Sequence, residues 1–331
     1  MIDVPSPLSP LDLEALTSRW EETGDPACSV LVPTYMHERF LADALDGILA
    51  QRTTFPFEVI VRDDASTDGT RAVAEDYCER YPGIVHLIAH DRRTYPHESP
   101  LRELQLRARG EFVAICEGDD YWTDPHKLQR QVDGLRADST KSLAFHDSII
   151  LDERDGPVRG KRHELSPDEL CDRSGESVVL NAIPFRSLLF RNSSEAALPE
   201  QYSGQVWTED TFLSARLGLL GDALHVPGIS PSVYRLHPGN LSYRVAEHPY
   251  VRRGRKIQVH LVIAEYLAAH GRRDLAGAFL LRASGQLASL VASEHPGGED
   301  ILASRALQAL PWRRRLVVSL RSLVPQRLRG R

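Results

Sequence analysis

Short apolar runs alternate with stretches of helical spacing along the first half of the chain. The run Cys28–Pro33 is rich in β-branched residues and predicts a buried strand. Apolar positions from Phe40 to Leu49 then recur at helical spacing. This alternation predicts an α/β fold, in which helices cover both faces of a mostly parallel sheet. Further strands are expected over residues 57–62, 84–89, 112–116 and 143–151, with helices over 69–81, over 101–109 and from Asp124-Pro125 onward.

The second half predicts a less regular α/β region followed by a helical extension. Residues 152–176 are charged and interrupted by Gly and Pro, so we expect a surface excursion there rather than core. Two helical patterns, about 252–270 and 273–292, meet at Gly271 and predict a helical hairpin. Between these regions the pattern predicts strands over 187–190 and 233–236 and a helix with Leu213, Leu217 and Leu220 on one face. We divide the chain into a leader with one short helix (1–26), an α/β domain (27–245) and a C-terminal hairpin with a tail (246–331).

Composition narrows the function classes. The 331 residues carry a formal charge of −6, which argues against a nucleic-acid binder with a basic surface. The four cysteines lack zinc-ligand spacing, as expected of reduced thiols. The N-terminus has prolines and an acid where a signal peptide needs a basic start and an apolar run. No window reaches the roughly 18 apolar residues of a membrane span. We therefore expect a cytoplasmic protein.

Two pairs of acids each follow a predicted strand. Asp63-Asp64 comes after the second strand, and Asp119-Asp120 follows the fourth. In an open α/β sheet, ligands bind outside the carboxyl ends of the strands, so both pairs are expected at the binding edge. Crowded carboxylates repel one another unless a cation is present. Oxygen-only ligands suit Mg²⁺ or Mn²⁺ bridging a diphosphate, where the metal neutralises the charge of the departing group.

Four segments carry motifs that are individually weak but occur in a specific order. They are Val32–Tyr35, Arg62–Thr70, Arg109–Trp122 with Glu-Gly-Asp-Asp-Tyr-Trp at its end, and Trp207–Phe212. Together they resemble the motifs of family 2 glycosyltransferases, which are inverting enzymes with a GT-A (Rossmann-like) fold. The resemblance covers about residues 27–240. It implies a nucleotide-binding half (27–125) and an acceptor-binding half (126–245).

The resemblance also implies how the donor is bound. Pro33, Thr34 and Tyr35 would line the base pocket, with Tyr35 stacking on uracil or thymine. Asp64 would accept a hydrogen bond from the imide N–H of that base, a donor that adenine lacks. This implies a UDP-sugar or dTDP-sugar rather than an adenine nucleotide.

Metal and base residues follow from the same resemblance. Asp119 and Asp120 occupy the DxD-like position, with Asp120 as the expected direct metal ligand and Asp119 contacting ribose or metal. His237 lies where the family carries an element near the diphosphate, and we count it among the metal residues. Asp210 would be the general base that removes the acceptor hydroxyl proton, because Asp is ionised at neutral pH without a large pKa shift.

Structural alternatives remain for several of these residues. Asp63-Asp64 could form a turn and a helix cap, and Glu209-Asp210 opens a predicted helix, where acids are favoured by the dipole. Trp122, Trp207 and His146 are as readily explained by packing. Arg92 and Arg93 could reach the diphosphate, but exposed loop arginines are common, and we leave them out of the site.

Two other functions compete with glycosyl transfer. A nucleotidyltransferase that makes the activated sugar would normally carry a Gly-rich loop after the first strand, where this chain has Thr34–Glu38. A non-catalytic sugar-nucleotide-binding scaffold is disfavoured by the retained acids. The acceptor is expected to be a saccharide, a lipid-linked molecule or a natural product, and the sequence leaves the oligomeric state open.

The end of the chain is basic. Residues 301–331 contain eight arginines and no acidic residue, and apolar positions from Leu316 to Val324 recur at helical spacing. Such a segment can lie peripherally on the inner face of an anionic membrane through residues 305–331. A helix that packs on the acidic remainder of the protein explains the same pattern, and both interpretations stay open.

Overall fold

The computed structural model describes residues 4–22, 24–153, 160–240 and 249–292. The chain forms two compact units, residues 1–243 and 244–331. The first contains both sheets, and the second contains the last two described helices.

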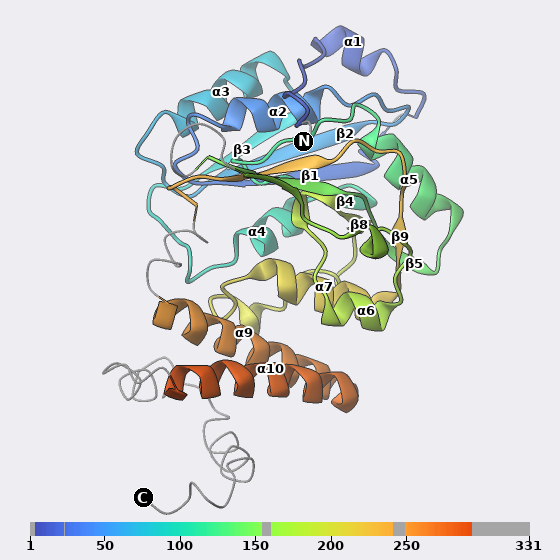
Figure 1. Cartoon of the computed structure of the whole chain (residues 1–331). Helices are drawn as coiled ribbons and strands as arrows, with labels where there is room; N and C mark the ends of the chain where they lie inside the picture. The colour runs from blue at the N-terminus through green and yellow to red at the C-terminus, as the bar shows by residue number, and fades with distance from the viewer. Residues whose placement is uncertain (1–3, 23, 154–159, 241–248, 293–331) are drawn as a thin grey trace, which may run out of the picture. The chain divides into compact units, whose positions relative to one another are not determined.

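A seven-stranded sheet in the order β3-β2-β1-β4-β8-β5-β9 forms the centre of the first unit (Figure 1). Neighbouring strands among β1 to β4 are parallel, whereas β8 runs antiparallel to both β4 and β5. The predicted mostly parallel sheet is therefore confirmed. Its strands are β1 (Cys28–Thr34), β2 (Phe57–Asp63), β3 (Val85–Ala89), β4 (Phe112–Ile115), β5 (Lys141–Phe145), β8 (Leu189–Arg191) and β9 (Asp222–His225).

Helices cover both faces of this sheet and enclose two hydrophobic cores (Figure 1). Successive side chains of β1 point to opposite faces, as in any strand: Val30 and Val32 lie in one core, and Leu31 lies in the other. The first core is covered by α2 (Leu41–Leu49), α3 (Thr70–Arg80) and α5 (Lys127–Ala137), and the second by α4 (Pro100–Arg107), α6 (Gly175–Leu180) and α7 (Glu209–Leu220). Shorter helical elements are α1 (Leu13–Thr17), η1 (Pro167–Glu169), η2 (Phe185–Ser187) and η3 (Glu200–Tyr202).

The apolar run 143–151 forms two strands, so the prediction of a single strand is wrong. After β5 the chain turns at His146 and Asp147, and β6 (Ser148–Asp152) enters a second sheet. The Asp147 Oδ1 accepts the Ser148 N–H at 2.7 Å, which fixes the corner. Both strands are buried, so hydrophobicity alone does not mark where one ends. The second sheet has the order β10-β6-β7, with β7 (Gly160–His163) and β10 (Ser232–Leu236).

Two further expectations need correction. Part of the charged segment 152–176 is structured, because β7 pairs with β6 and α6 packs on the second core. In addition, α5 begins at Lys127 after His126 rather than at Asp124-Pro125. The Asp124 carboxylate accepts the N–H groups of His126 and Ser230, each at 2.8 Å, so it ties two loops together instead of capping the helix.

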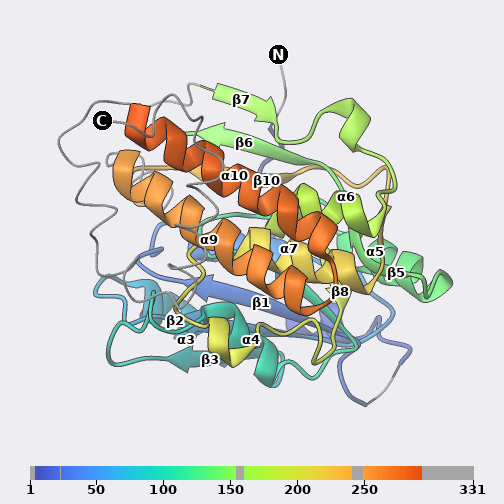
Figure 2. The ribbon, with the colours of Figure 1, turned by 90° about the horizontal axis from the view of Figure 1, so that it is seen from below.

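The second unit contains the predicted helical hairpin. Its helices are α9 (Pro249–Ala269) and α10 (Arg273–Ala292), joined at Gly271, whose φ of +78° favours glycine. They lie side by side (Figure 2), and the rings of His260 and Phe279 meet edge to face at 5.8 Å. Among the described residues, no helix has the length and apolar character needed to cross a membrane. The Arg-rich segment 305–331 lies outside the described residues.

A lysine lies inside the first core. Lys127 is fully buried. Its Nζ donates to Gln131 Oε1 at 2.7 Å and lies 4.1 Å from the ring centre of Trp122. Burial lowers the pKa of Lys127 to about 7, because a charged ammonium is poorly solvated there.

We expect this lysine to make stability depend on pH. Between about pH 7 and the ordinary lysine pKa of about 10.4, the unfolded chain binds a proton that the folded chain does not, so stability rises with pH. Urea unfolding of wild type and Lys127→Met should show the wild type gaining about 1–2 kcal/mol over the variant between pH 6.5 and 8.5. Parallel pH profiles of the two proteins would contradict this expectation.

Candidate active site

The four parallel strands bring their carboxyl ends to one edge of the sheet. Thr34 of β1 pairs with Asp63 of β2, and Asp63 pairs with Ala89 of β3. The loops that leave these strands carry Tyr35, Asp64 and Arg93, and the turn after β4 carries Asp119. Residues that are far apart in the sequence therefore meet at the edge where such sheets bind ligands.

Two loops at this edge hold non-glycine residues in the left-handed backbone region. Met36 has φ 60° and Ala65 has φ 61°, a strained conformation that persists only where surrounding contacts enforce it. The Met36 N–H donates to Ser66 Oγ at 2.9 Å, and the His37 N–H donates to Thr70 Oγ1 at 2.8 Å. These bonds join the β1 and β2 loops. Asp63-Asp64 does not cap α3, which begins after Gly69 without a side-chain cap.

Asp64 is buried and held by its neighbours. It accepts the N–H groups of Thr94 at 2.9 Å and Tyr95 at 3.1 Å. The Arg62 guanidinium lies 3.2 Å away and also pairs with Glu103 at 2.7 Å. Burial alone raises the pKa of Asp64, but the two N–H donors and Arg62 outweigh it, so the pKa is lowered. Asp64 is therefore an ionised acceptor, while its role toward a base stays a prediction.

Tyr35 has a neighbour, Arg93, that the sequence alone does not assign to the site. The guanidinium carbon of Arg93 lies 4.3 Å from the centre of the Tyr35 ring. The Arg93 Nε lies 3.9 Å from Asp64 Oδ2. The position of Arg93 in the sequence does indicate that it lies near Tyr35. Arg93 follows β3, whose carboxyl end lies at the same edge of the sheet as those of β1 and β2.

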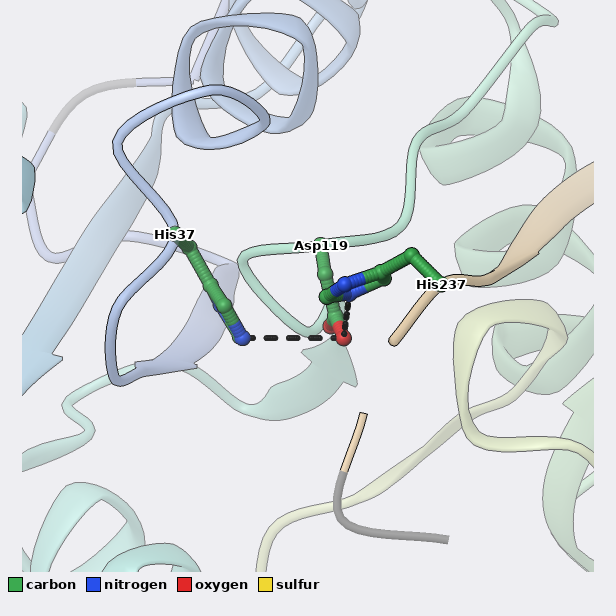
Figure 3. Close-up of side chains that lie close together, drawn as sticks. All are labelled: His37, Asp119 and His237. Carbon is green, nitrogen blue, oxygen red and sulfur yellow. Dashed lines mark hydrogen bonds and ion pairs between the residues drawn. The ribbon is translucent and has the colours of Figure 1, made fainter. Parts of the chain in front are cut away.

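A cluster of three side chains forms beside the turn after β4 (Figure 3). The Asp119 Oδ2 lies 3.5 Å from His37 Nε2 and 3.2 Å from His237 Nε2, and it accepts from Asn240 Nδ2 at 2.8 Å. The candidate ligand atoms of His37, Asp119 and His237 all lie within 4.8 Å of one another. Gly118 makes this turn possible, because a Cβ there would lie 2.6 Å from Thr34 Oγ1. Sequence reasoning found Asp119 and His237 but missed His37.

Protonation in this cluster suits a cation. Burial opposes ionisation of Asp119, but His37 and His237 outweigh it and lower its pKa to about 2. Burial lowers the pKa of His37, which keeps its imidazole neutral. The Gly239 N–H donates to His237 Nδ1 at 3.1 Å, so a neutral His237 carries its proton on Nε2 and donates it to Asp119. A metal at the Nε2 of His237 would replace this proton. The Nδ1 of His37, unlike that of His237, has no hydrogen-bond partner among the described residues.

Asp120 faces a different environment from Asp119. Its Oδ2 accepts Arg186 Nε at 2.8 Å, and its Oδ1 accepts the Arg235 N–H at 3.1 Å. Arg186 also pairs with Glu164 and lies 4.1 Å from the ring centre of Tyr234. Sequence reasoning expected Asp120 to be the direct metal ligand. The structure instead places it outside the His37 cluster, with both oxygens engaged by groups of the chain itself.

The expected base lies at the start of α7. Asp210 is partly exposed and accepts the Thr211 N–H at 2.7 Å, and burial raises its pKa. Glu117, Asp119 and Asp120 form an acidic turn after β4. The pKa of Glu117 is raised mainly by burial and by the charges of Asp120 and Asp119, and Asp210 adds a smaller effect in the same direction. Asp210 therefore lies close enough to this acidic turn to interact with it electrostatically. Neighbouring Glu209 instead accepts the Leu101 N–H of α4 at 3.3 Å. Just before them, the Trp207 carbonyl accepts the Tyr95 hydroxyl at 3.1 Å, which joins this segment to the Asp64 loop.

Comparison with known proteins shows similarity to one family. Residues 29–197 match the family described as Glycosyl transferase family 2. The uncharacterised protein Rv1520 of Mycobacterium tuberculosis is 35% identical over 215 residues, which cover 63% of this chain and 58% of that protein. The chain thus matches little more than half the length of this relative.

Two solved structures share the fold. Residues 1–349 of TarS from S. aureus, in complex with UDP-GlcNAc, match with a TM-score of 0.53 and 17% identity over 89% of this chain and 91% of that one. The mannosyltransferase PcManGT from Pyrobaculum calidifontis, in complex with GDP-Man and Mn²⁺, matches with a TM-score of 0.51 and 22% identity over 91% of this chain and 87% of that one. Identities this low support the α/β architecture alone.

We expect Asp120→Ala to destabilise the fold, because it leaves the buried Arg186 guanidinium without one of its two carboxylate partners. Breaking a buried ion pair in this way typically costs about 3–5 kcal/mol. Urea unfolding measures the loss. The matched control is Asp76→Ala, which removes an exposed pair with Arg80 and should cost less than about 1 kcal/mol. Equal losses for the two variants would contradict a structural role for Asp120.

Proposed function

Because the chain belongs to glycosyl transferase family 2, we propose that it transfers a sugar from a nucleoside-diphosphate sugar to an acceptor hydroxyl, with inversion at the anomeric carbon. The observation that carries this proposal is the arrangement of Asp64 and Asp119 on loops at one sheet edge, with Asp210 in the electrostatic field of the same turn. Asp64 would accept from the base, Asp119 would hold the cation that neutralises the anionic diphosphate, and Asp210 would take the proton of the incoming hydroxyl.

Asp64 supports a donor whose base presents an N–H. Its lowered pKa keeps it an acceptor, which suits the imide N–H of uracil or thymine, a ring donor that adenine lacks. Guanine presents an equivalent N–H, and PcManGT was solved with GDP-Man whereas TarS was solved with UDP-GlcNAc. We keep UDP-sugar or dTDP-sugar as the proposed donor, with a GDP-sugar as the competitor to be tested.

A divalent metal fits the residues around Asp119. One ionised carboxylate and two imidazoles form a mixed donor set, which suits a first-row transition ion such as Mn²⁺ better than Mg²⁺. The sequence predicts Asp120, Asp119 and His237 as metal residues, and the cluster contains the last two together with His37. When bound, such an ion neutralises charge on the departing diphosphate. His37 offers its Nε2 without losing a hydrogen bond, whereas His237 would give up the one from Gly239.

Asp210 is proposed to take the proton of the acceptor hydroxyl. As that oxygen bonds to the anomeric carbon, the bond from the carbon to the diphosphate breaks and the nucleotide leaves with the electron pair. The acceptor is proposed to be a saccharide of the cell surface; the chain is 31% identical over 134 residues to TuaG of Bacillus subtilis, whose name refers to teichuronic acid biosynthesis. Lipid-linked and natural-product acceptors, and membrane contact through 305–331, stay as alternatives for experiment.

The proposed transfer is tested first by ligand-induced stabilisation. UDP-, dTDP- and GDP-sugars are compared in a thermal-shift assay with and without Mn²⁺, because a ligand that binds only the folded state raises its melting temperature. One uridine or thymidine donor should shift the melting temperature, and the shift should grow with Mn²⁺. A nucleotidyltransferase would also respond to a nucleoside triphosphate, and a scaffold would bind without turnover.

Metal binding should depend on Asp119 and His37. Calorimetry with Mn²⁺ and UDP should show that Asp119→Asn and His37→Ala each weaken binding by at least tenfold, because each removes one ligand. His126→Ala is the control, since that histidine lies half exposed next to Asp124 and away from the cluster. Unchanged Mn²⁺ binding in both site variants would exclude the cluster as the metal site.

Asp210→Asn should reduce transfer while leaving donor binding intact. The amide keeps the size of the side chain but removes its basicity, so we expect a loss of about 10²–10⁴-fold in the transfer rate. Glu209→Gln is the matched neighbour, which retains an acceptor for the Leu101 N–H and should stay within a few-fold of wild type. If Glu209→Gln lost transfer and Asp210→Asn kept it, the base would be Glu209.

A further inference from the structure

Arg93 makes two contacts that resemble those expected of a nucleobase. Its guanidinium carbon lies 4.3 Å from the Tyr35 ring centre, and its Nε points toward Asp64 Oδ2 at 3.9 Å. A planar group with N–H donors therefore already lies over the Tyr35 ring beside Asp64. A base that stacks on this face of Tyr35 must enter where the guanidinium now lies.

The backbone around Arg93 is held on both sides. Thr94 and Tyr95 donate their N–H groups to Asp64. Before Arg93, the carbonyl of His90 accepts from the Arg71 guanidinium, which also pairs with Asp63 at 3.2 Å. The loop is therefore fixed next to the base pocket, and a movement of Arg93 is a movement of its side chain.

The side chain of Arg93 is free to make that movement. It is 45% exposed, and its distance of 3.9 Å to Asp64 makes a weak, solvent-screened pair. Asp64 does not need it, because the buried Arg62 already lies 3.2 Å from the other carboxylate oxygen. A rise of about 3.5 Å, the thickness of one aromatic layer, would open the space between the guanidinium and Tyr35.

We propose that Arg93 is a base-binding residue that closes over the second face of the nucleobase, which then stacks between the Tyr35 ring and the Arg93 guanidinium. This rests on the proposed function, because it requires a nucleotide donor. Arginine suits the role, since its planar guanidinium stacks on flat rings, whereas the lysine ammonium does not. Such stacking is found where proteins bind unpaired bases. It adds affinity for the base without choosing between uracil and guanine, a choice left to Asp64 and to pocket size.

Three variants of the full-length protein test this clamp. Arg93→Ala removes the stacking plane, Arg93→Lys keeps the charge but not the plane, and Arg92→Ala removes the neighbouring exposed arginine as a control. Dissociation constants are measured for UDP by calorimetry and for uridine, which lacks phosphate, by NMR titration. If wild type binds GDP more tightly, GDP and guanosine take their place. Both Arg93 variants should weaken nucleotide and nucleoside by the same factor, about tenfold for one lost stacking contact, and Arg92→Ala should match wild type.

Other outcomes overturn the clamp in distinct ways. Wild-type affinity in Arg93→Lys would mean that only charge matters, and weaker UDP binding with unchanged uridine binding would place Arg93 on the diphosphate. Tighter binding in Arg93→Ala would make the side chain a competitor for the base. Nucleotide binding by wild type with no effect of any variant rejects the clamp and leaves the proposed function standing. Wild-type protein that binds no UDP, dTDP or GDP rejects both.

Discussion

The buried guanidinium of Arg186 balances the acidic turn on which this domain depends. The parallel strands place Glu117, Asp119 and Asp120 together after β4, where mutual repulsion and burial work against ionisation. Arg186 pairs with Asp120 and Glu164 and lies over the ring of Tyr234. A buried cation is tolerated only when such partners surround it. Tyr234 belongs to β10 of the second sheet and Glu164 directly follows β7 of that sheet, so the second sheet brings to Arg186 the partners that keep its charge near the acidic turn.

The adjacent acids Asp119 and Asp120 consequently have pKa values that are shifted in opposite directions. Asp119 is ionised well below neutral pH, with imidazoles and an amide around one oxygen. Burial raises the pKa of Asp120 even though Arg186 opposes the shift. Successive side chains of a tight turn point into different surroundings, so neighbouring positions in a motif need not share a task. The Asp119 carboxylate is bonded to His237 and Asn240, whereas the Asp120 carboxylate is bonded to Arg186 and to the backbone of Arg235.

The sequence predicts the parallel half of the sheet well because its strands are buried on both faces. Val30, Leu31 and Val32 all lie in cores, and such continuous apolar runs bounded by turn residues are characteristic of parallel strands. The same property hides the corner at His146, since β5 and β6 are buried on either side of it. Asp124 resembles a helix cap in sequence, but its carboxylate also binds a loop more than a hundred residues away, which no local pattern contains.

The site was predictable where the chemistry is local and unpredictable where it depends on distant partners. Asp64 and Asp119 stand directly after strands, so their placement follows from the topology. The separation of Asp119 from Asp120 follows from Arg186 and from the backbone of Arg235, which lie far along the chain. In the sequence, Glu164 belongs to a segment that is expected to form a charged surface loop. Its ion pair with Arg186 appears only in the structure. His37 and Arg93 lie on loops whose backbones are held by hydrogen bonds to residues that follow β2, and no local sequence pattern shows these bonds.

The late position of Arg186 in the chain bears on how the domain is made. During synthesis, the strands β1 to β4 and the acidic turn leave the ribosome before Arg186 and Arg235 are joined to the chain. Until then the turn has no cation to balance it, and β4 has an open edge that β8 later covers. A fragment that stops near residue 125 would keep the residues expected to bind the nucleotide but lack the Arg186 charge that balances the acidic turn. The two halves of the α/β domain thus complete each other's charge balance and strand pairing within one compact unit.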